Sequence, residues 1–275
     1  MRISPTQVSL TLSATAPEAT SEVTLTNDSS SSVLVTIRFE DFSATALGTP
    51  QLGAAASRYS LKKWIRTSTP EFTLEPGASR KVDLRVTNEA ELAPGGHYTA
   101  LVVTQSSPEA AAGEKNVQLR DALVSSIFLV KEGGESPRLG VGDFVLEHSL
   151  FSLSSTQSVQ LLNLGNTQVV PRGTVQIIDP LGNLVAKGTI NNESSILLPE
   201  SGRLYVSELN QIAEATVPGN YRTEVAFRYD GRDEYTIAYQ SSFLLPLNIF
   251  LLISAAGVVV LLICIRMSVR YWKRR

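Results

Sequence analysis

The sequence predicts an all-β chain: two tandem Ig-like or chaperone-like β-sandwiches, followed by one transmembrane α-helix. Three observations predict this fold class. Apolar and polar residues alternate through most of residues 1–242, as in strands with one buried face. Turn signals recur about every ten residues, the spacing of antiparallel sandwiches. Near the C-terminus, the run from Phe243 to Ile265 holds no charged residue.

The alternating segments predict which residues form the two cores. Successive strand side chains point to opposite faces of a sheet, so the apolar positions are expected on the buried face. In the first half these positions are Val8, Leu10, Leu12, Val23, Leu25, Val33, Val35, Ile37, Phe39, Val82, Leu84 and Val86. In the second half residues 221–229 alternate, Asp230-Gly231 supplies a tight turn, and residues 235–239 return. In this part of the chain only residues 208–215 suggest a turn or two of helix.

Composition places the breaks between these segments. Residues 43–57 are small and polar and are expected to form a long surface loop, and residues 106–116 a hairpin loop. Residues 132–138 combine charge, Gly and Pro, which is typical of an interdomain linker. We therefore expect one sandwich at residues 1–131 and a second at residues 139–242.

The second half repeats the turn pattern of the first, at a distance that indicates domain duplication. Each half has an Asn-led turn, then a Pro turn before a strand, then a Pro-Gly turn before a Tyr. The matching residues are Asn27 and Asn163, Pro76 and Pro199, and Tyr98 and Tyr221. We expect Tyr98 and Tyr221 to be structural corner tyrosines rather than ligand contacts.

The uncharged run at residues 243–265 is long enough to cross a membrane, because roughly 20 helical residues span a hydrocarbon core about 30 Å thick. The basic residues that follow are Arg266, Arg270, Lys273, Arg274 and Arg275. Residues 234–242, just before the run, hold no Lys or Arg. Basic flanks stay on the cytoplasmic side. We therefore expect a single-pass cell-membrane protein, with residues 1–242 outside and residues 266–275 as a basic cytoplasmic tail.

Three further features bear on an exported body. Residues 1–5 contain no apolar leader, so we expect the start of the sequence to be trimmed or misannotated. Without the five tail cations, 19 basic residues face 26 acidic ones, which argues against nucleic acid as a partner. The single cysteine, Cys264, lies in the expected span. The body therefore has no disulfide, which points to a bacterial protein that depends on hydrophobic burial.

The sequence offers no catalytic or metal-binding constellation. The two histidines, His97 and His148, lie far apart, and a structural or exposed role is expected for both. The chain has no HExxH, no paired cysteines, no Gly-rich phosphate loop and no GxSxG. Asp230, Asp233 and Glu234 offer oxygens of the kind that calcium uses, but a polar hairpin tip explains them as well. We expect no enzyme activity, no cofactor and no metal.

The strongest candidate for a binding site is the cationic segment Lys62, Lys63, Trp64 and Arg66, close to the 43–57 loop. Glycan recognition commonly stacks a sugar on an aromatic ring and holds acidic groups with Lys or Arg. The alternative is that Trp64 packs in the core beneath the loop while the cations occupy the outer face. Both interpretations fit the sequence.

Several motifs carry a resemblance to a known family. Trp64-Ile65 ahead of FTLEPGAS (residues 72–79) and PGGHYTALV (94–102) resemble the peptidoglycan-binding domain of bacterial WxL-interacting surface proteins. NLGNTQVVPRGTVQIIDPLGNLVAKG (163–188), with LLPESGRLY and PGNY, resembles the Ig-like domain that follows it. The resemblance covers nearly the whole chain and implies cell-wall glycan or another surface protein as the partner. The second domain is shorter than its usual counterpart, so the resemblance implies the wall-binding role more than the WxL-type partner.

We therefore expect a non-enzymatic, membrane-anchored cell-surface binding protein that tethers the membrane to the cell wall or to another surface protein. The alternative is a structural stalk or accessory subunit that pairs with a neighbour through exposed strand edges. An enzyme is the weakest of the three hypotheses, since no acid, base and nucleophile come together in the sequence.

Overall fold

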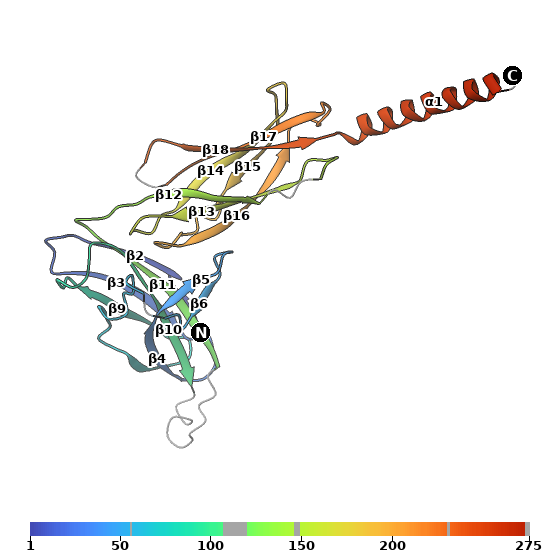
Figure 1. Cartoon of the computed structure of the whole chain (residues 1–275). Helices are drawn as coiled ribbons and strands as arrows, with labels where there is room; N and C mark the ends of the chain where they lie inside the picture. Colours follow the sequence, from blue (N-terminus) through green and yellow to red (C-terminus); the bar gives the residue numbers. More distant parts are fainter. Residues whose placement is uncertain (56, 107–119, 146–148, 230–231, 273–275) are drawn as a thin grey trace. The chain divides into compact units, whose positions relative to one another are not determined.

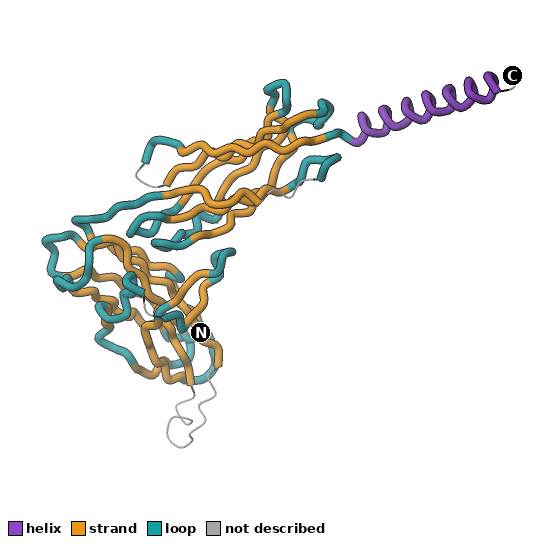
Figure 2. Tube along the Cα trace, viewed as in Figure 1, coloured by secondary structure: helices purple, strands orange, loops and turns teal. Residues whose placement is uncertain are grey.

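The computed structural model describes residues 1–55, 57–106, 120–145, 149–229 and 232–272. It confirms the predicted fold class, because sandwich-like sheets make up the body and a single long helix follows them (Figures 1 and 2). The chain divides into two compact units. Unit 1 consists of Met1–Gly140 with Leu162–Val169 and Ile196–Arg203, and unit 2 of Val141–Leu161, Val170–Ser195 and Leu204–Arg275.

Two facing sheets form the first sandwich, within unit 1. The four-stranded sheet has the order β1 (Arg2–Ser4), β3 (Glu18–Thr26), β9 (Ser79–Thr87) and β7 (Ile65–Arg66). The five-stranded sheet has the order β2 (Gln7–Leu12), β11 (Arg120–Lys131), β10 (Gly95–Ser106), β4 (Val33–Glu40) and β8 (Glu71–Leu74). The predicted core positions of the first half are all buried except Phe39, which is half-buried against the same core. Two-residue alternation therefore identified the inner faces correctly.

The region expected as a long loop contains a short hairpin instead. β5 (Phe42–Ala44) pairs with β6 (Pro50–Leu52). The Thr45 N–H donates to Thr49 O at 3.0 Å and closes the connecting turn. Phe42 anchors the hairpin, because its ring packs edge-on against Tyr98 at 5.2 Å between centroids. The two strands of three residues each were not predicted, because the residues of this segment are small or polar and show no apolar alternation. Most of the expected 106–116 loop lies outside the described residues.

One seven-stranded sheet forms the second sandwich by folding over itself. Its order is β12 (Leu139–Val145), β13 (Thr156–Asn163), β16 (Gly202–Gln211), β15 (Leu184–Ile190), β14 (Pro171–Ile178), β17 (Gly219–Tyr229) and β18 (Thr236–Leu244). β15 and β16 pair over only three residues, at Ala186–Gly188 and Leu209–Gln211. On either side of this narrow join the strands form two layers (Figure 1). Val159 and Leu161 of one layer, and Val175 and Phe227 of the other, are fully or almost fully buried.

The expected helical turns at residues 208–215 do not form. β16 continues as a strand to Gln211, and the N–H groups of Ile212 and Ala213 then donate to Val185 O at 2.8 and 3.2 Å. The backbone of this segment therefore finds its hydrogen bonds in the neighbouring strand, which removes the need for helical bonds.

The Asn-led turn of the first half is organised by a fully buried side chain. Asn27 Nδ2 donates to Ser31 O at 2.8 Å and to Leu74 O at 2.9 Å, while its Oδ1 accepts the Ser29 N–H at 3.0 Å. The Asn27 N–H donates to Ala78 O at 2.9 Å, two residues after Pro76. One side chain thus bonds three backbone groups, and the bond to Leu74 O, which is buried, ties the turn to the end of β8.

The second Asn-led turn has the same arrangement. Asn163 Nδ2 donates to Thr167 O at 2.8 Å and to Leu197 O at 3.2 Å, and its Oδ1 accepts the Gly165 N–H at 3.0 Å. The Asn163 N–H donates to Ser201 O at 2.8 Å, again two residues after the turn proline, Pro199. The repeat in the sequence therefore corresponds to a repeated hydrogen-bond network.

The two repeat tyrosines differ in their surroundings. Tyr221 is a corner tyrosine: its hydroxyl donates to Val217 O, four residues earlier, at 2.8 Å. Tyr98 is buried instead in an aromatic cluster with Phe42 and Phe128. Burial raises the pKa of the Tyr98 phenol, while a hydrogen bond with Ser57 acts in the opposite direction. Both tyrosines have structural surroundings.

The helix α1 runs from Leu247 to Trp272 and is long and apolar enough to cross a membrane by length and composition. Phe243, expected as the first residue of the span, lies instead in β18, where it pairs with Asn220. Pro246 separates strand from helix, because its ring suits a helix start and cannot continue a ladder. The helix also includes Arg266 and Arg270 of the basic tail, whereas Lys273, Arg274 and Arg275 lie outside the described residues.

Candidate functional site

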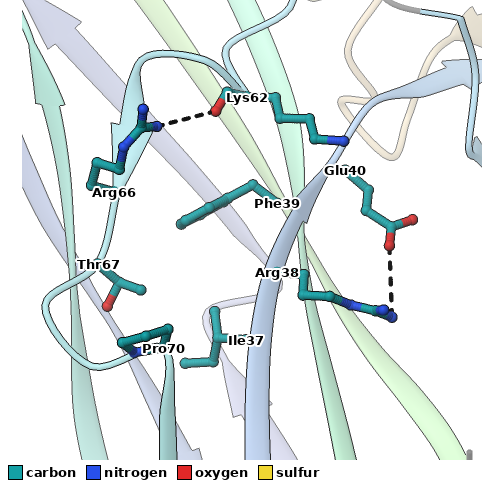
Figure 3. Close-up of a pocket in the computed structure, with 8 residues that line it drawn as sticks. All are labelled: Ile37, Arg38, Phe39, Glu40, Lys62, Arg66, Thr67 and Pro70. Carbon is teal, nitrogen blue, oxygen red and sulfur yellow. Dashed lines mark hydrogen bonds and ion pairs between the residues drawn. The ribbon is translucent and has the colours of Figure 1, made fainter.

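A hollow of about 500 Å³ lies at the edge of the first sandwich, and we call it the β4 pocket. Its lining residues are Ile37, Arg38, Phe39, Glu40, Lys62, Arg66, Thr67 and Pro70 (Figure 3). β4 supplies four of them, and the segment from the loop before β7 to the start of β8 supplies the others. Its volume lies within the usual range for small-ligand sites, which is about 300–1,000 Å³.

The pocket exists because β8 covers only part of β4. β8 pairs with β4 over Val33–Thr36, and the last bond of this ladder runs from Ile37 N–H to Pro70 O at 2.8 Å. Among the described residues, no strand pairs with this side of Arg38–Glu40. A short, open strand edge therefore borders the hollow.

A carboxylate of the opposite sheet holds the chain away from this edge. Asp83 of β9 accepts the Ser68 N–H at 3.2 Å and the Ser68 hydroxyl at 2.5 Å. The hydrogen bond from the Ser68 hydroxyl is the main reason that the pKa of the Asp83 carboxyl lies below its usual value. These bonds draw residues 67–69 toward the four-stranded sheet and leave the β4 edge open.

The lining is apolar at its centre and mainly cationic at its rim. Figure 3 shows the Phe39 ring in the middle, between Arg66 and Arg38. Arg66 Nη1 donates to Ile65 O at 2.7 Å and to Lys62 O at 3.5 Å, which fixes its guanidinium beside the pocket. Arg38 lies 3.7 Å from the Glu40 carboxylate, the single acidic group of the lining. Three cations against one carboxylate favour an anionic ligand with an apolar or flat portion for Phe39.

Of the four predicted binding residues, two line the pocket and two do not. Lys62 and Arg66 are in the lining. The Trp64 side chain is half-buried and packs against the core of the first sandwich, and the Trp64 backbone N–H donates to Leu61 O at 2.9 Å. Lys63 Nζ lies 4.5 Å from the centroid of the Trp64 ring. The indole therefore packs as the alternative interpretation has it, and Phe39 is the aromatic residue of the lining.

Sequence reasoning missed Arg38, Phe39 and Glu40 as part of this site. They belong to an alternating strand, and nothing in their local pattern indicates that β8 stops short of them. A weak signal existed in Pro70, because a proline at the start of a strand cannot donate to a ladder. This signal marks an interruption, but not which residues lie opposite it.

His97 has a structural environment. Its side chain is almost fully buried, and because Ala93 O can only accept, the contact at 2.8 Å assigns the proton to Nε2. Burial is the main reason that the pKa of the imidazole lies below its usual value, and the nearby Lys131 ammonium lowers this pKa further. His148 lies outside the described residues.

We expect His97 to couple stability to pH. The unfolded chain protonates this imidazole near pH 6.5, and the folded chain only at lower pH, so the unfolded state binds more protons between the two values. Stability should therefore decrease as the pH falls below about 6.5. Histidine-selective NMR of the full chain in detergent should show one imidazole that titrates below this value and disappears in His97→Gln. A His97 resonance with an ordinary or raised pKa would contradict this prediction.

The acidic candidates for calcium do not form a site in the described part of the chain. Asp230 lies outside the described residues, and Asp233 is fully exposed, 4.0 Å from Arg228. Among the described residues, no group of three or more His, Cys, Asp or Glu side chains could hold a metal ion.

The chain is similar to several solved structures at low sequence identity. No family model matches the chain, and no curated protein matches it. Among solved structures, it is similar to the class 5 fimbriae chaperone CfaA (11% identity over 90% of this chain and 99% of that chain, TM-score 0.47). It is also similar to the E. coli chaperone DraB (14%, 86% and 96%, TM-score 0.41) and the Pseudomonas aeruginosa chaperone CupB2 (12%, 88% and 100%, TM-score 0.41). At 11–14% identity, these similarities concern the fold alone.

Proposed function

We propose that this chain is a non-enzymatic, membrane-anchored cell-surface protein that binds an anionic partner through the β4 pocket. The observation that carries the proposal is the lining itself: Lys62, Arg66 and Arg38 surround Phe39 beside an open strand edge. Nothing in this lining provides a paired acid and base, whereas cations around an aromatic ring are well suited to binding. In this proposal the first sandwich contains the pocket, and α1 anchors both sandwiches to the membrane.

The anchor and its orientation are part of the proposal. α1 has an uncharged stretch from Leu247 to Ile265, followed by Arg266 and Arg270. Because basic residues next to a span remain in the cytoplasm, the sandwiches would lie outside the cell. Attachment to a membrane raises the local concentration of the pocket near the wall, which allows a site of modest affinity to form a tether.

Cell-wall glycan is the first candidate for the ligand. Wall polymers carry carboxylates or phosphates and present flat sugar faces, so they match the cations and the phenyl ring of the pocket. The resemblance of residues 72–79 and 94–102 to the peptidoglycan-binding domain of WxL-interacting proteins supports the same ligand class. A purified full chain in detergent should sediment with isolated peptidoglycan at low salt and be released at high salt. A chain that stays in the supernatant at all salt concentrations would contradict the wall-binding proposal.

A second candidate is an accessory subunit that binds another surface protein by strand pairing. The open edge of β4 at Arg38–Glu40 is one place for an added strand, and β18 is another, since it ends the seven-stranded sheet. β18 also exposes Ile237, Tyr239 and Phe243 on one face. Strand addition uses such edges, with backbone bonds for affinity and side-chain contacts for specificity.

Crosslinking in whole cells separates the two candidates. Photo-crosslinkers placed at Arg38 and at Tyr239 should both yield wall material or nothing if the ligand is a glycan. One dominant protein adduct from either position, with no retention on peptidoglycan, would favour the accessory subunit over the wall tether.

A further inference from the structure

The loop between β12 and β13 is attached to the start of α1. Leu245 N–H donates to Leu150 O at 2.8 Å, and the Phe151 ring lies 5.0 Å from the Phe250 ring of the helix. Only Leu245 and Pro246 separate β18 from α1. The loop therefore contacts both the strand-to-helix join and the first helical turn, and these contacts fix its depth relative to that turn.

The length of the uncharged helix sets this depth in a membrane. From Leu247 to Ile265 the helix extends about 28 Å at 1.5 Å per residue, which matches a hydrocarbon core about 30 Å thick. If Arg266 marks one boundary of the hydrocarbon core, Leu247 lies at the other boundary, because the uncharged part of the helix is only as long as the core is thick. Phe250 then lies about 4.5 Å inside the hydrocarbon. A ring that packs against Phe250 must reach the same boundary region.

Two further loops lie at this end of the second sandwich (Figure 1). Gly219, the first residue of β17, pairs with Leu244, and Ile178, the last residue of β14, pairs with Arg222 nearby. The turn at residues 179–183 is therefore beside the end of β18. The loop after β16 is there as well, because Ile212 donates to Val185 O at the start of β15.

Each of the three loops exposes a large aliphatic side chain. Leu150 is 48% exposed, Leu181 is 71% exposed and Ile212 is 57% exposed. Residues 149–155 contain no charged side chain. Exposed apolar groups gathered at the end of a domain mark a contact surface, and here the uncharged helix starts from the same end.

Three backbone N–H groups in two of these loops are already bonded within the chain. Phe151 N–H donates to Ser149 Oγ at 3.2 Å, and the Asp179 carboxylate accepts the N–H groups of Leu181 and Asn183 at 2.9 and 2.8 Å. A turn that forms its own hydrogen bonds loses less when water is replaced by lipid headgroups.

We propose that this end of the second sandwich is a lipid-contacting surface, with Leu150 and Phe151 in the membrane interface and Leu181 and Ile212 resting on it. The partner is the lipid of the leaflet in which α1 begins. Such a contact holds the second sandwich in a fixed orientation on the membrane, where a helix alone would let it swivel. This inference rests on the proposed function in one respect: it requires that α1 spans a membrane.

Site-directed spin labelling of the full chain in phosphatidylcholine vesicles tests the proposal. The native Cys264 lies within α1 and is exposed, so its label reports on the anchor itself. In a Cys264→Ser background, labels at Leu150→Cys, Leu181→Cys and Ile212→Cys report on the three loops. Glu193→Cys is the matched control, because residue 193 is exposed in the turn that follows β15, at the other end of the strand.

Collisions with oxygen, which concentrates in lipid, are compared with collisions with a water-soluble nickel chelate. We expect the ratio of the oxygen collision rate to the nickel-chelate collision rate to be several-fold higher at Leu150→Cys than at Glu193→Cys. At Leu150→Cys this ratio should approach the ratio at Cys264. Leu181→Cys and Ile212→Cys should give intermediate ratios. All three side chains are exposed, so their replacement leaves the core intact.

Two results would overturn the inference and leave the anchor standing. One is a lipid-like ratio at Cys264 with water-like ratios at all three loops. The other is spin–spin broadening at the loops, which would show that a second copy of the chain covers this surface. A water-like ratio at Cys264 would instead contradict the membrane anchor, and with it the proposed function.

Discussion

Replacing Asn27 with aspartate should destabilise the first sandwich by about 3 kcal/mol or more. The two shapes are nearly identical, but Asn27→Asp removes the Nδ2 donors and places an acceptor against Ser31 O and Leu74 O, which are 2.8 and 2.9 Å from Nδ2. The buried Leu74 O loses its donor, which costs about 1–3 kcal/mol, and the burial of a carboxylate against this carbonyl costs more. Guanidinium unfolding in detergent, followed by Trp64 fluorescence in a Trp272→Phe background, measures the change in the free energy of unfolding.

The same variant should show a diagnostic dependence on pH. Burial against two carbonyl oxygens raises the pKa of the introduced carboxyl above that of the unfolded chain, near 3.9. The folded state then binds more protons between the two values, so the penalty relative to the native chain should shrink as the pH falls. Gln51→Glu is the control, because Gln51 is exposed in β6 and undergoes the same change of amide to carboxylate. Equal, small losses in both variants would show that the buried network contributes little.

Reversing two charges of the β4 pocket should weaken ligand binding by about 100-fold. A hydrogen bond to a charged group contributes about 1.5–3 kcal/mol, which corresponds to about tenfold or more in affinity for each cation lost. Lys62→Glu with Arg66→Glu removes two such cations from the lining and adds two repelling carboxylates. The affinity for isolated peptidoglycan, measured by sedimentation at several salt concentrations, tests this loss.

A control with the same change in net charge separates the pocket from the overall field. Lys187→Glu with Arg232→Glu alters two exposed cations that belong to unit 2, whereas the β4 pocket belongs to unit 1. If binding requires the pocket, Lys187→Glu with Arg232→Glu retains most of the affinity for peptidoglycan and the salt dependence of binding. Lys62→Glu with Arg66→Glu loses both. Equal losses in the two double variants would assign binding to general electrostatic attraction and exclude the β4 pocket as its site.

Two-residue alternation was sufficient to predict the fold class, because one face of almost every strand packs on a core. Val23 and Leu25, for example, are fully buried, as their spacing predicts. The β5–β6 hairpin could not be predicted in this way, since its residues are small or polar and Phe42 alone points into an aromatic cluster. Residues 208–211 were also misjudged, because their conformation depends on bonds to β15 from a distant part of the chain.

The candidate site was predictable only in part, for a similar physical reason. Lys62 and Arg66 could be identified locally, as cations next to an indole and a loop. The pocket, however, depends on where β8 stops along β4 and on the bonds from Ser68 to Asp83, which join segments far apart in sequence. For Trp64 the sequence left ligand contact and core packing open, and only its contacts in the fold show that the ring packs against the core.

Labelling with a membrane-impermeant maleimide tests the proposed topology most directly, since it compares the two ends of α1 in intact cells. In a Cys264→Ser background, Glu193→Cys places a thiol on the second sandwich and Ser268→Cys places one beyond the uncharged part of the helix. The proposed orientation predicts that the thiol at 193 reacts in intact cells and that the thiol at 268 reacts only after permeabilisation. Reaction at 268 with protection at 193 in intact cells would place the sandwiches inside and contradict a surface function.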